Sequence, residues 1–600
     1  MALISKASLL MVPSTYEQEK LYNVLPSGNR APDSTDQNSG YDQTRADFTF
    51  DRGSNAAATR IGSDGLIKKY RENLLVQSNQ FDTTWFNSNS TETSGQSGYD
   101  GSSDAWLLES TGPSGSLRQS ISYSSVICYS FYAKAGTVNY VRLRLDAATQ
   151  VNAWFNLSSG SVGTLSDGIS SSIESVGNGW WRVSVTANVT SLTTIRVYPS
   201  PNDAGGNSSG DNIYIQNAQL ESGLVSTDYL DSGATTAKAG VLIDLPRINY
   251  DANGENGALL LEPQRANSTT YSEYIGASGV GALSVTNNTN ATKSPEGLYN
   301  ATLIAEDTTT GYHRIGISHG SMSNATKTFS VFAKWAGGSG RKWLTMDNGP
   351  ICYFDLENGT KGNVGANCTA DIEDYGNGWY RCHFTHTSSS SGTLYIGTAS
   401  ANGGAGNHLG NGEDAMYFYG VQAEDGASYV SSYIPNHGES GGVTRAADSC
   451  SVTGVSDVIG QTEGTLFFDV NISRVVGNEA IGTINSGGYA NHVTIQRIGN
   501  TIQFVRNSAT QSGATIVTSA TISAGRYKLA IAYKSGDTAC FLNGTQVSTT
   551  QTQTFTNASL SVVRMSGDAI GAIPISDSVK QATLFKERLT NSELATLTTL

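Results

Sequence analysis

Short runs of alternating apolar and polar residues, separated by turn residues, follow one another along most of this 600-residue chain. In one such run Trp181, Val183 and Val185 fall on one face of a strand, and the residues between them fall on the other face. Hardly any segment keeps the apolar period of 3.6 residues that an amphipathic helix needs. The pattern therefore predicts an all-β fold made of tandem antiparallel β-sandwich domains.

The chain also contains an internal duplication. VGNGWWRVSV at 176–185 returns as YGNGWYRCHF at 375–384, and the similar segments around these words occur in the same order in both copies. Asn178-Gly179 and Asn377-Gly378 supply residues that tolerate positive φ, so we expect a tight hairpin turn at each. The duplication predicts two related sandwiches in series.

The two ends of the chain show different patterns. MALISKASLLMV ends at Pro13 and predicts a first β-strand rather than a signal peptide. Residues 27–47 are polar and low in apolar side chains, which predicts an extended N-terminal arm that becomes ordered on docking. We therefore expect deletion of residues 1–47 to leave a folded protein.

The last 150 residues predict a third sandwich. Alternating runs lie at 463–473, 493–506 and 527–547, with turn residues between them. Near the end Thr590 and Glu593 have the spacing of a capping box, which predicts one short terminal helix.

These patterns divide the chain into five parts. They are an N-terminal anchoring arm with short strands (1–72), a first sandwich named repeat 1 (73–232), a connector (233–257), a second sandwich named repeat 2 (258–446), and a C-terminal sandwich (447–600).

Several segments resemble a known family. The order FYAKAG (131–136), GNGWWRVSVTA (177–187) and IYIQNAQLESG (213–223) is similar to the carbohydrate-binding-module-like jelly rolls of tailed-phage tail fibres, head fibres and related virion proteins. FLNGTQV (541–547) and LFKERLTNSEL (584–594) resemble the hairpin and terminal helix of a concanavalin-like, laminin-G-type domain.

The resemblance implies a setting and a function. The expected protein is a structural component of the virion, assembled in the host cytoplasm and anchored to other virion proteins through its N-terminal arm. It would display its sandwiches to host-surface glycans, and a homotrimer is the expected oligomer. Two alternatives remain: a capsid or tail decoration protein without glycan binding, and a polysaccharide depolymerase.

Composition narrows the range of partners. The formal net charge is −14, and the chain contains no block of Lys or Arg, so it lacks the clustered cations that neutralise phosphates. No stretch reaches the roughly 18 apolar residues that a membrane-spanning helix needs. We therefore expect neither nucleic acid binding nor membrane insertion.

Signatures of catalysis are missing from the sequence. It contains no G-x-S-x-G elbow, H-E-x-x-H helix, Walker loop or C-x-x-C pair. We expect a protein that is not an enzyme, with no catalytic residues and no cofactor.

The sequence contains two arrangements of possible metal ligands, and neither predicts a site. His383 and His386 are three residues apart on a predicted strand, so they point to opposite faces. The segment from Asp251 to Glu262 has oxygen ligands at calcium-loop spacing, but Asn256 stands where such a loop needs Gly. A turn leading into a strand is favoured there.

Aromatic residues are the candidates for ligand binding. A flat ring with a polar rim suits the apolar face of a sugar. The candidates recur in both copies outside the hairpins: Tyr140, Trp154, Trp343 and Tyr353. The alternative is that all four are core residues, and we expect Trp180 and Trp379 to be core residues too.

Overall fold

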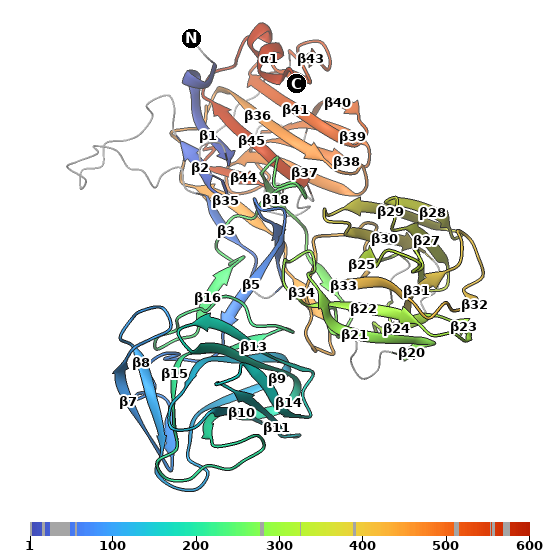
Figure 1. Cartoon of the computed structure of the whole chain (residues 1–600). Helices are drawn as coiled ribbons and strands as arrows, with labels where there is room; N and C mark the ends of the chain where they lie inside the picture. Colours follow the sequence, from blue (N-terminus) through green and yellow to red (C-terminus); the bar gives the residue numbers. More distant parts are fainter. Residues whose placement is uncertain are drawn as a thin grey trace, which may run out of the picture.

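The computed structural model describes the chain in segments: 3–14, 18–24, 48–53, 57–275, 281–323, 326–387, 392–508, 515–552, 554, 559–567 and 577–600. The described residues form three lobes made almost entirely of antiparallel strands (Figure 1). Repeat 1 lies at the lower left, repeat 2 at the right and the C-terminal sandwich at the top. The all-β prediction is confirmed.

The strands of repeat 1 join in one continuous sheet that folds over itself. In order of pairing they are β12 (Ser161–Ser166), β11 (Val151–Asn156), β10 (Tyr140–Asp146), β14 (Trp180–Ser200), β9 (Ser116–Ala135), β15 (Asn212–Ser222), β8 (Ala105–Ser110) and β7 (Ser90–Gln96). In addition β13 (Ser170–Gly177) pairs with β14, and β6 (Phe86–Ser88) pairs with β9. One half of β14 pairs with β13 and the other half with β10, so this long strand runs from one layer into the other.

Repeat 2 has a similar strand arrangement, but its strands form two separate sheets because no long strand among the described residues runs from one layer into the other. One layer contains β20 (Gly281–Leu283), β24 (Arg314–Ser318), β31 (Thr393–Ala399), β26 (Trp343–Asp347), β27 (Ile351–Asp355) and β28 (Thr360–Val364). The other contains β21 (Val285–Thr292), β22 (Ala301–Glu306), β33 (Asp414–Asp425), β25 (Lys327–Trp335), β30 (Tyr380–His386) and β29 (Cys368–Asp374). Two short pairs add β23 (Thr310–Tyr312) with β32 (Asn407–Leu409), and β19 (Arg265–Asn267) with β34 (Val443–Arg445).

The predicted hairpin turns are present in both copies. Asn178 and Asn377 each have a φ of 53°, and the glycine after each has a φ of 77°. Two consecutive residues with positive φ match the tight turn that the sequence predicts. Trp180 and Trp379 are buried as expected, although they pack on the side of the sheet away from the core between the layers.

A glycine beneath an aromatic ring explains why a second short segment recurs in both repeats. Gly160 has a φ of 68°, and a Cβ there would lie 2.1 Å from the indole of Trp181. In repeat 2 Gly359 has a φ of 63°, and a Cβ there would lie 2.5 Å from the ring of Tyr380. These glycines end the similar segments WFNLSSG (154–160) and YFDLENG (353–359), and each makes room for the second aromatic residue of the neighbouring hairpin.

The C-terminal sandwich recruits strands from elsewhere in the chain. One layer contains β17 (Ile248–Asn249), β18 (Ala258–Leu261), β45 (Asp577–Phe585), β36 (Glu463–Ile472), β41 (Gly525–Lys534), β42 (Ala539–Leu542) and β43 (Thr545–Gln546), with β1 (Ala7–Pro13) and β2 (Leu21–Val24). The other contains β3 (Thr49–Asp51), β35 (Ser449–Thr453), β44 (Val562–Met565), β37 (Asn478–Asn485), β38 (His492–Ile498), β39 (Thr501–Asn507) and β40 (Thr515–Thr521). The helix α1 (Asn591–Thr598) begins at the predicted capping box of Thr590 and Glu593.

The N-terminal segment is part of this sandwich. The predicted strand ending at Pro13 is confirmed as β1, which pairs with β45, and Leu9 and Met11 are buried in the shared core. The structure therefore contradicts the expectation that residues 1–47 can be removed without effect on folding. Residues 25–47, which include the polar segment 27–47 of the predicted arm, lie outside the described residues.

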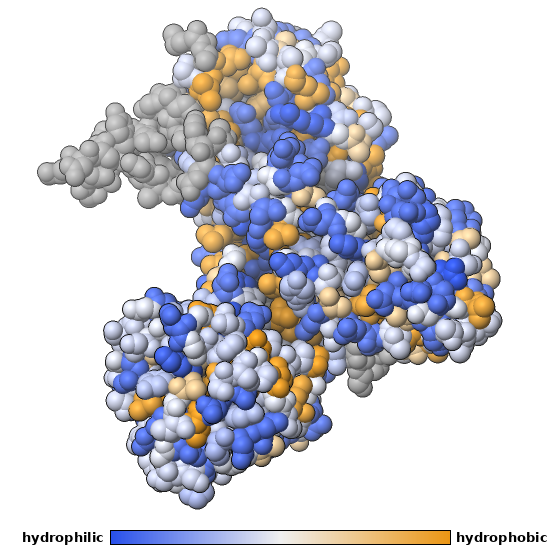
Figure 2. Space-filling model, in the orientation of Figure 1, coloured by the Kyte–Doolittle hydropathy of each residue, from blue (hydrophilic) through white to orange (hydrophobic). Residues whose placement is uncertain are grey.

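The three lobes meet at a short central sheet. It contains β4 (Thr59–Ile61), β5 (Ile67–Asn73) and β16 (Ala237–Gly240), and it lies between the lobes in Figure 1. Figure 2 shows a mixed surface on the two repeats and a gathering of hydrophobic residues over the C-terminal sandwich. Within the described residues, no helix combines the length and the hydropathy that a bilayer crossing requires.

Candidate functional site

One layer of repeat 1 carries aromatic and charged side chains on the side away from the core. Along β10 the residues Val141, Leu143 and Leu145 enter the core, so the residues between them face outward. Neighbouring strands add further side chains to this surface, which we name face 1: Tyr140, Arg142, Arg144, Trp154 and Tyr198.

Face 1 is built around a stacked guanidinium. Arg142 lies opposite Trp154 on β11 and Tyr198 on β14. Its Cζ is 4.9 Å from the centre of the indole and 4.7 Å from the centre of the phenol ring. The indole Nε1 of Trp154 is buried and has no hydrogen-bond partner among the described residues.

The corresponding layer of repeat 2 has a surface of similar composition, which we name face 2: Tyr312, Arg314, Thr345, Asp347, Tyr353 and Tyr395. These residues line a shallow hollow of about 20 Å³. The Cζ of Arg314 lies 4.4 Å from the ring centre of Tyr312 and 3.8 Å from that of Tyr395. Its Nη1 donates to Asp347 Oδ2 at 3.2 Å. Face 2 thus combines tyrosine rings, of which Tyr312 is exposed, with one cation and one carboxylate.

The four predicted aromatic residues lie on these layers, outside the clusters that fill the core between them. Trp154 and Tyr353 are nonetheless buried, each 8% exposed, and Tyr140 and Trp343 are partly buried. The register places Trp154 opposite Arg142 and Tyr353 opposite Thr345, so these two aromatics occupy corresponding positions. Tyr140 and Trp343 likewise stand at the same end of corresponding strands. No finding tests whether these residues bind a ligand, so that assignment stays a prediction.

Sequence reasoning missed the residues that hold the rings together. They are Arg142, Tyr198, Arg314, Asp347 and Tyr395. The alternation along β10 would have found Arg142, because it lies between core residues of the same strand. Arg314 and Tyr395 are brought together only by the pairing of β24 with β31, which no local pattern predicts.

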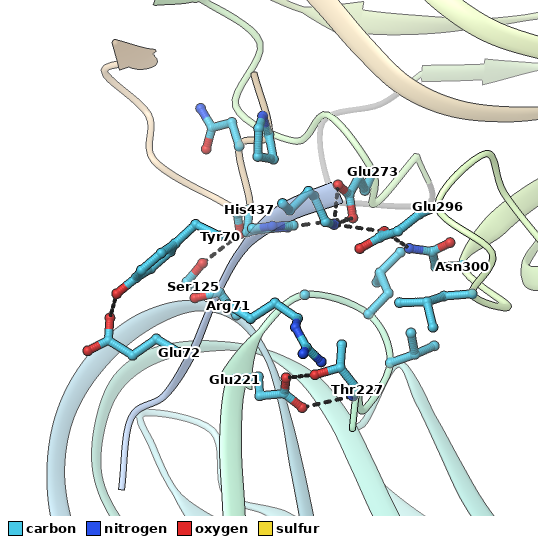
Figure 3. Close-up of a pocket in the computed structure, with 18 of the residues that line it drawn as sticks. Tyr70, Arg71, Glu72, Ser125, Glu221, Thr227, Glu273, Glu296, Asn300 and His437 are labelled. Atoms are coloured by element: carbon cyan, nitrogen blue, oxygen red, sulfur yellow. Dashed lines mark hydrogen bonds and ion pairs between the residues drawn. The ribbon is translucent and has the colours of Figure 1, made fainter. Parts of the chain in front are cut away.

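A second candidate site is a cavity of about 190 Å³ between the repeats, beside β5 (Figure 3). Lys69 Nζ lies 2.9 Å from carboxylate oxygens of both Glu273 and Glu296. Tyr419 and Tyr433 donate their hydroxyls to Glu273 Oε1 at 3.1 and 3.0 Å. The charged side chains of this cluster are paired with one another, so it serves to attach β5 to repeat 2.

The titration of this cluster follows from burial and charge. Burial acts to lower the pKa of Lys69, but the carboxylates of Glu273 and Glu296 outweigh it and raise the pKa. Burial acts to raise the pKa of Glu273, and the charge of Lys69 outweighs it and lowers the pKa. Both groups are therefore ionised at neutral pH, as an ion pair.

The calcium-like segment folds as the predicted turn. Asp251 Oδ1 accepts hydrogen bonds from the backbone N–H groups of Asn253 and Glu255 at 3.0 and 2.9 Å. Glu262 is instead buried against Arg247 and Arg445 at 2.8 and 2.9 Å. Asp251 and Glu262 therefore serve different local structures.

The structure also brings together three residues of the kinds that bind metals, and the sequence analysis predicted no metal site. Glu306, His313 and His408 each place a potential ligand atom within 4.8 Å of the others. His383 and His386 lie on opposite faces of β30, as predicted, with His386 buried and His383 beside Glu373.

Comparisons with known proteins give distant structural matches alone. No protein-family model matches the chain, and no curated protein sequence matches it. Among solved structures, the CBM40 module of a Ruminococcus gnavus IT-sialidase bound to α2,3-sialyllactose matches with 14% identity over 23% of this chain and 84% of its own, at a TM-score of 0.21. The tandem CBM22 domain of Paenibacillus barcinonensis Xyn10C matches with 10% identity over 62% of this chain and 99% of its own, at a TM-score of 0.19. The structural neighbours thus include carbohydrate-binding modules with jelly-roll folds.

The comparisons also correct one prediction. A Trypanosoma rangeli sialidase in complex with the inhibitor DANA matches with 10% identity over 87% of this chain and 94% of its own, at a TM-score of 0.21. Since sialidases are among the matches, the prediction that the chain is not an enzyme is withdrawn. Matches this distant transfer no activity to this chain.

Proposed function

We propose that the chain binds glycans on face 2, with face 1 as a second binding surface. The observation that carries the proposal is the arrangement at the hollow of repeat 2. There, two tyrosine rings flank an arginine that is paired with an aspartate on an outward-facing sheet.

This arrangement suits the chemistry of a sugar. The C–H face of a pyranose packs on an aromatic ring, and its hydroxyls form hydrogen bonds with carboxylate and guanidinium groups. Tyr312 offers such a ring because 46% of its surface is exposed. Asp347 and Arg314 lie beside it and fix each other's orientation. A shallow site of this kind binds weakly, so two faces on one chain, or several chains in an oligomer, would raise avidity.

A glycan array probed with the full-length chain tests the proposal and identifies a ligand for titration. We expect Tyr312→Ala to weaken binding of that ligand roughly tenfold, which corresponds to the loss of one stacking contact. Tyr299→Ala is the matched control, because Tyr299 is also exposed, at 58%, and lies outside face 2. Equal affinity of the wild type and Tyr312→Ala for this glycan would contradict glycan binding on face 2.

As the biological setting we propose a virion fibre or decoration protein that attaches to the host surface, with a homotrimer as its assembly. Support comes from the resemblance of the FYAKAG, GNGWWRVSVTA and IYIQNAQLESG segments to phage modules. Contacts with other virion proteins would involve residues 25–47, because β1 and β3 on either side of this segment belong to the C-terminal sandwich.

Deletion of residues 25–47 alone tests this setting, because it spares the paired strands. We expect the shortened chain to fold and to bind its glycan, and to be absent from purified particles. Incorporation at the wild-type level would contradict the proposed anchor, and sedimentation of the purified chain as a monomer would contradict the trimer.

A further inference from the structure

Two cysteines of repeat 2 contact each other although they belong to different layers. Cys352 lies on β27, and Cys368 is the first residue of β29. Their side chains are within hydrogen-bonding contact of each other. All six cysteines of the chain carry free thiols in this structure. A disulfide requires two thiols that lie side by side, and these two meet that requirement.

The path of the chain between the two cysteines explains their contact. β27 pairs with β28, and the register places Cys352 opposite Val364. After β28 the chain turns back at once, because the backbone N–H of Cys368 donates to the Gly365 carbonyl at 3.3 Å. A Cβ at Gly365 would lie 3.0 Å from the backbone N of Ile351, so glycine lets this turn pack directly against β27. The turn thus delivers Cys368 to the neighbourhood of Cys352.

Both side chains face the core between the layers. Cys352 is fully buried in this core, and Cys368 is partly buried and packs against it from the other layer. Cys368, Ala370 and Ile372 are the residues of β29 that contact the core, which is the alternation expected of a strand. β28 and β29 are the edge strands of their two layers. A bond between Cys352 and Cys368 would therefore close the sandwich along this edge.

Repeat 1 shows that the fold does not require this pair. Ala153 holds the place of Cys352, because each directly precedes the aromatic residue at corresponding positions of β11 and β27. Ile169 holds the place of Cys368, because each directly precedes the residue that pairs with the sixth position after the hairpin tryptophan. Both positions thus differ together, with an aliphatic pair in one copy and two cysteines in the other. Because aliphatic side chains suffice to fill this part of the core, the joint presence of two thiols points to a bond between them.

We propose that Cys352 and Cys368 form a disulfide that joins and stabilises the two layers of repeat 2. β27 also carries Tyr353, which lines the hollow of face 2, so the bond would brace one strand of that surface. Disulfides persist outside cells and are rare in the cytoplasm, so the bond belongs to a chain exposed to oxidising surroundings. In the setting proposed above this is the released particle, but the pairing of the two cysteines does not depend on that setting.

The bond forms by exchange with a low-molecular-weight disulfide, which serves as the oxidant. Cys368 is the more accessible of the two cysteines, so its thiolate attacks one sulfur of the small disulfide and releases the other as a thiol. The thiolate of Cys352 then attacks Sγ of Cys368, which forms the internal bond and releases the second small thiol. In total, two protein thiols are oxidised to one disulfide, and one small disulfide is reduced to two thiols that take up the two protons.

Burial controls the rate of this exchange. It raises the pKa of the Cys368 thiol and raises that of Cys352 to about 12. Because the thiolate is the attacking species, the bond should form slowly at neutral pH and faster as the pH rises. The buried position of Cys352 also shields the finished bond from reductants in the solvent.

Incubation of the reduced full-length chain with oxidised glutathione at a pH of about 8.5, followed by thiol counting and peptide mass mapping, tests the pairing. We expect the folded chain to lose two of its six thiols, and the peptides that contain Cys352 and Cys368 to be linked. The bond closes a short loop of the chain, so it should raise the unfolding midpoint of repeat 2 by about 6–12 °C in calorimetry.

Two variants and a control complete the test. Cys352→Ala introduces the residue that repeat 1 carries at this position, and it should keep all of its thiols after the same treatment. Cys368→Ser should behave in the same way, and it keeps the test decisive if Cys352→Ala does not fold. Cys382→Val is the matched control, because Cys382 is a buried cysteine of the same core and should leave the linkage intact. Circular dichroism confirms that each variant is folded.

The outcomes separate cleanly. Linkage of Cys352 to Cys368 in the wild type and in Cys382→Val, with none in Cys352→Ala, supports the disulfide. A folded wild type that keeps all six thiols, gains only bound glutathione, or links a different pair overturns it, as does an unchanged unfolding midpoint after oxidation. Since the readout is thiol chemistry, the outcome is independent of whether face 2 binds glycans.

Discussion

Replacing Lys69 with methionine tests how the repeats are held together. Lys69 lies on β5, between the lobes, and its ammonium contacts Glu273 and Glu296 at 2.9 Å. Its side chain is 11% exposed and that of Glu273 is fully buried. Methionine fills most of the same volume, so the change removes a charge without opening a large cavity.

The expected cost follows from the carboxylate that remains. Removing one partner of a buried ion pair leaves an uncompensated charge and costs about 3–5 kcal/mol. Tyr419 and Tyr433 keep their hydrogen bonds to Glu273, which places the effect toward the lower end of that range. For a domain of this size, such a loss lowers the unfolding midpoint by about 6–20 °C.

Differential scanning calorimetry of the full-length chain measures this shift. Lys68→Met is the control: Lys68 is the next residue of β5, and its pair with Asp64 at 2.5 Å is exposed to solvent. An exposed pair is worth only about 0–1 kcal/mol. The double variant Lys69→Met/Glu273→Gln should regain part of the loss. A Lys69→Met midpoint within about 2 °C of the Lys68→Met midpoint would refute the reasoning.

Further predictions concern the other lobes and the pH response. Met11→Ala should destabilise the C-terminal sandwich by about 2–5 kcal/mol in urea unfolding, because this fully buried side chain fills its core; a change below about 1 kcal/mol would contradict the placement of β1. Gly160→Ala should lower the thermal midpoint of repeat 1 and perturb tryptophan fluorescence, because its Cβ would meet Trp181; an unchanged spectrum would be inconsistent with that contact. Burial lowers the pKa of His319 to about 4, so its contribution to stability is complete above pH 6.5 and is lost as the pH falls toward 4, at no more than about 1.4 kcal/mol per pH unit. In the His319→Asn variant the unfolding free energy should change less between pH 6.5 and pH 4 than in the wild type. An equal change in both proteins would contradict this prediction. Thr590→Ala should cost about 1 kcal/mol by removing the cap of α1, and chemical denaturation with no shift would speak against it.

Local patterns predicted much of the fold. The turns at Asn178 and Asn377, the strand ending at Pro13 and the cap at Thr590 each depend on a few neighbouring residues, and each is confirmed. The pairing partner of β1 was not predicted. Its pairing with β45 joins opposite ends of the chain, and no local pattern specifies such a partner.

The candidate sites were predictable only in part. Tyr140 and Trp154 were found through duplication and residue type, and the structure places both on face 1. The pair of Arg314 with Tyr395 depends on the register of two strands far apart in sequence. The cluster of Glu306 and the two histidines draws on three segments, so no local pattern predicts it.

The most direct test of the central claim is a structure of the full-length chain with the strongest glycan from the array. The account predicts a sugar ring packed on Tyr312 in the hollow of face 2, with hydroxyls bonded to Asp347 and Arg314. A glycan bound only in the cavity beside β5, or on the C-terminal sandwich, would contradict it.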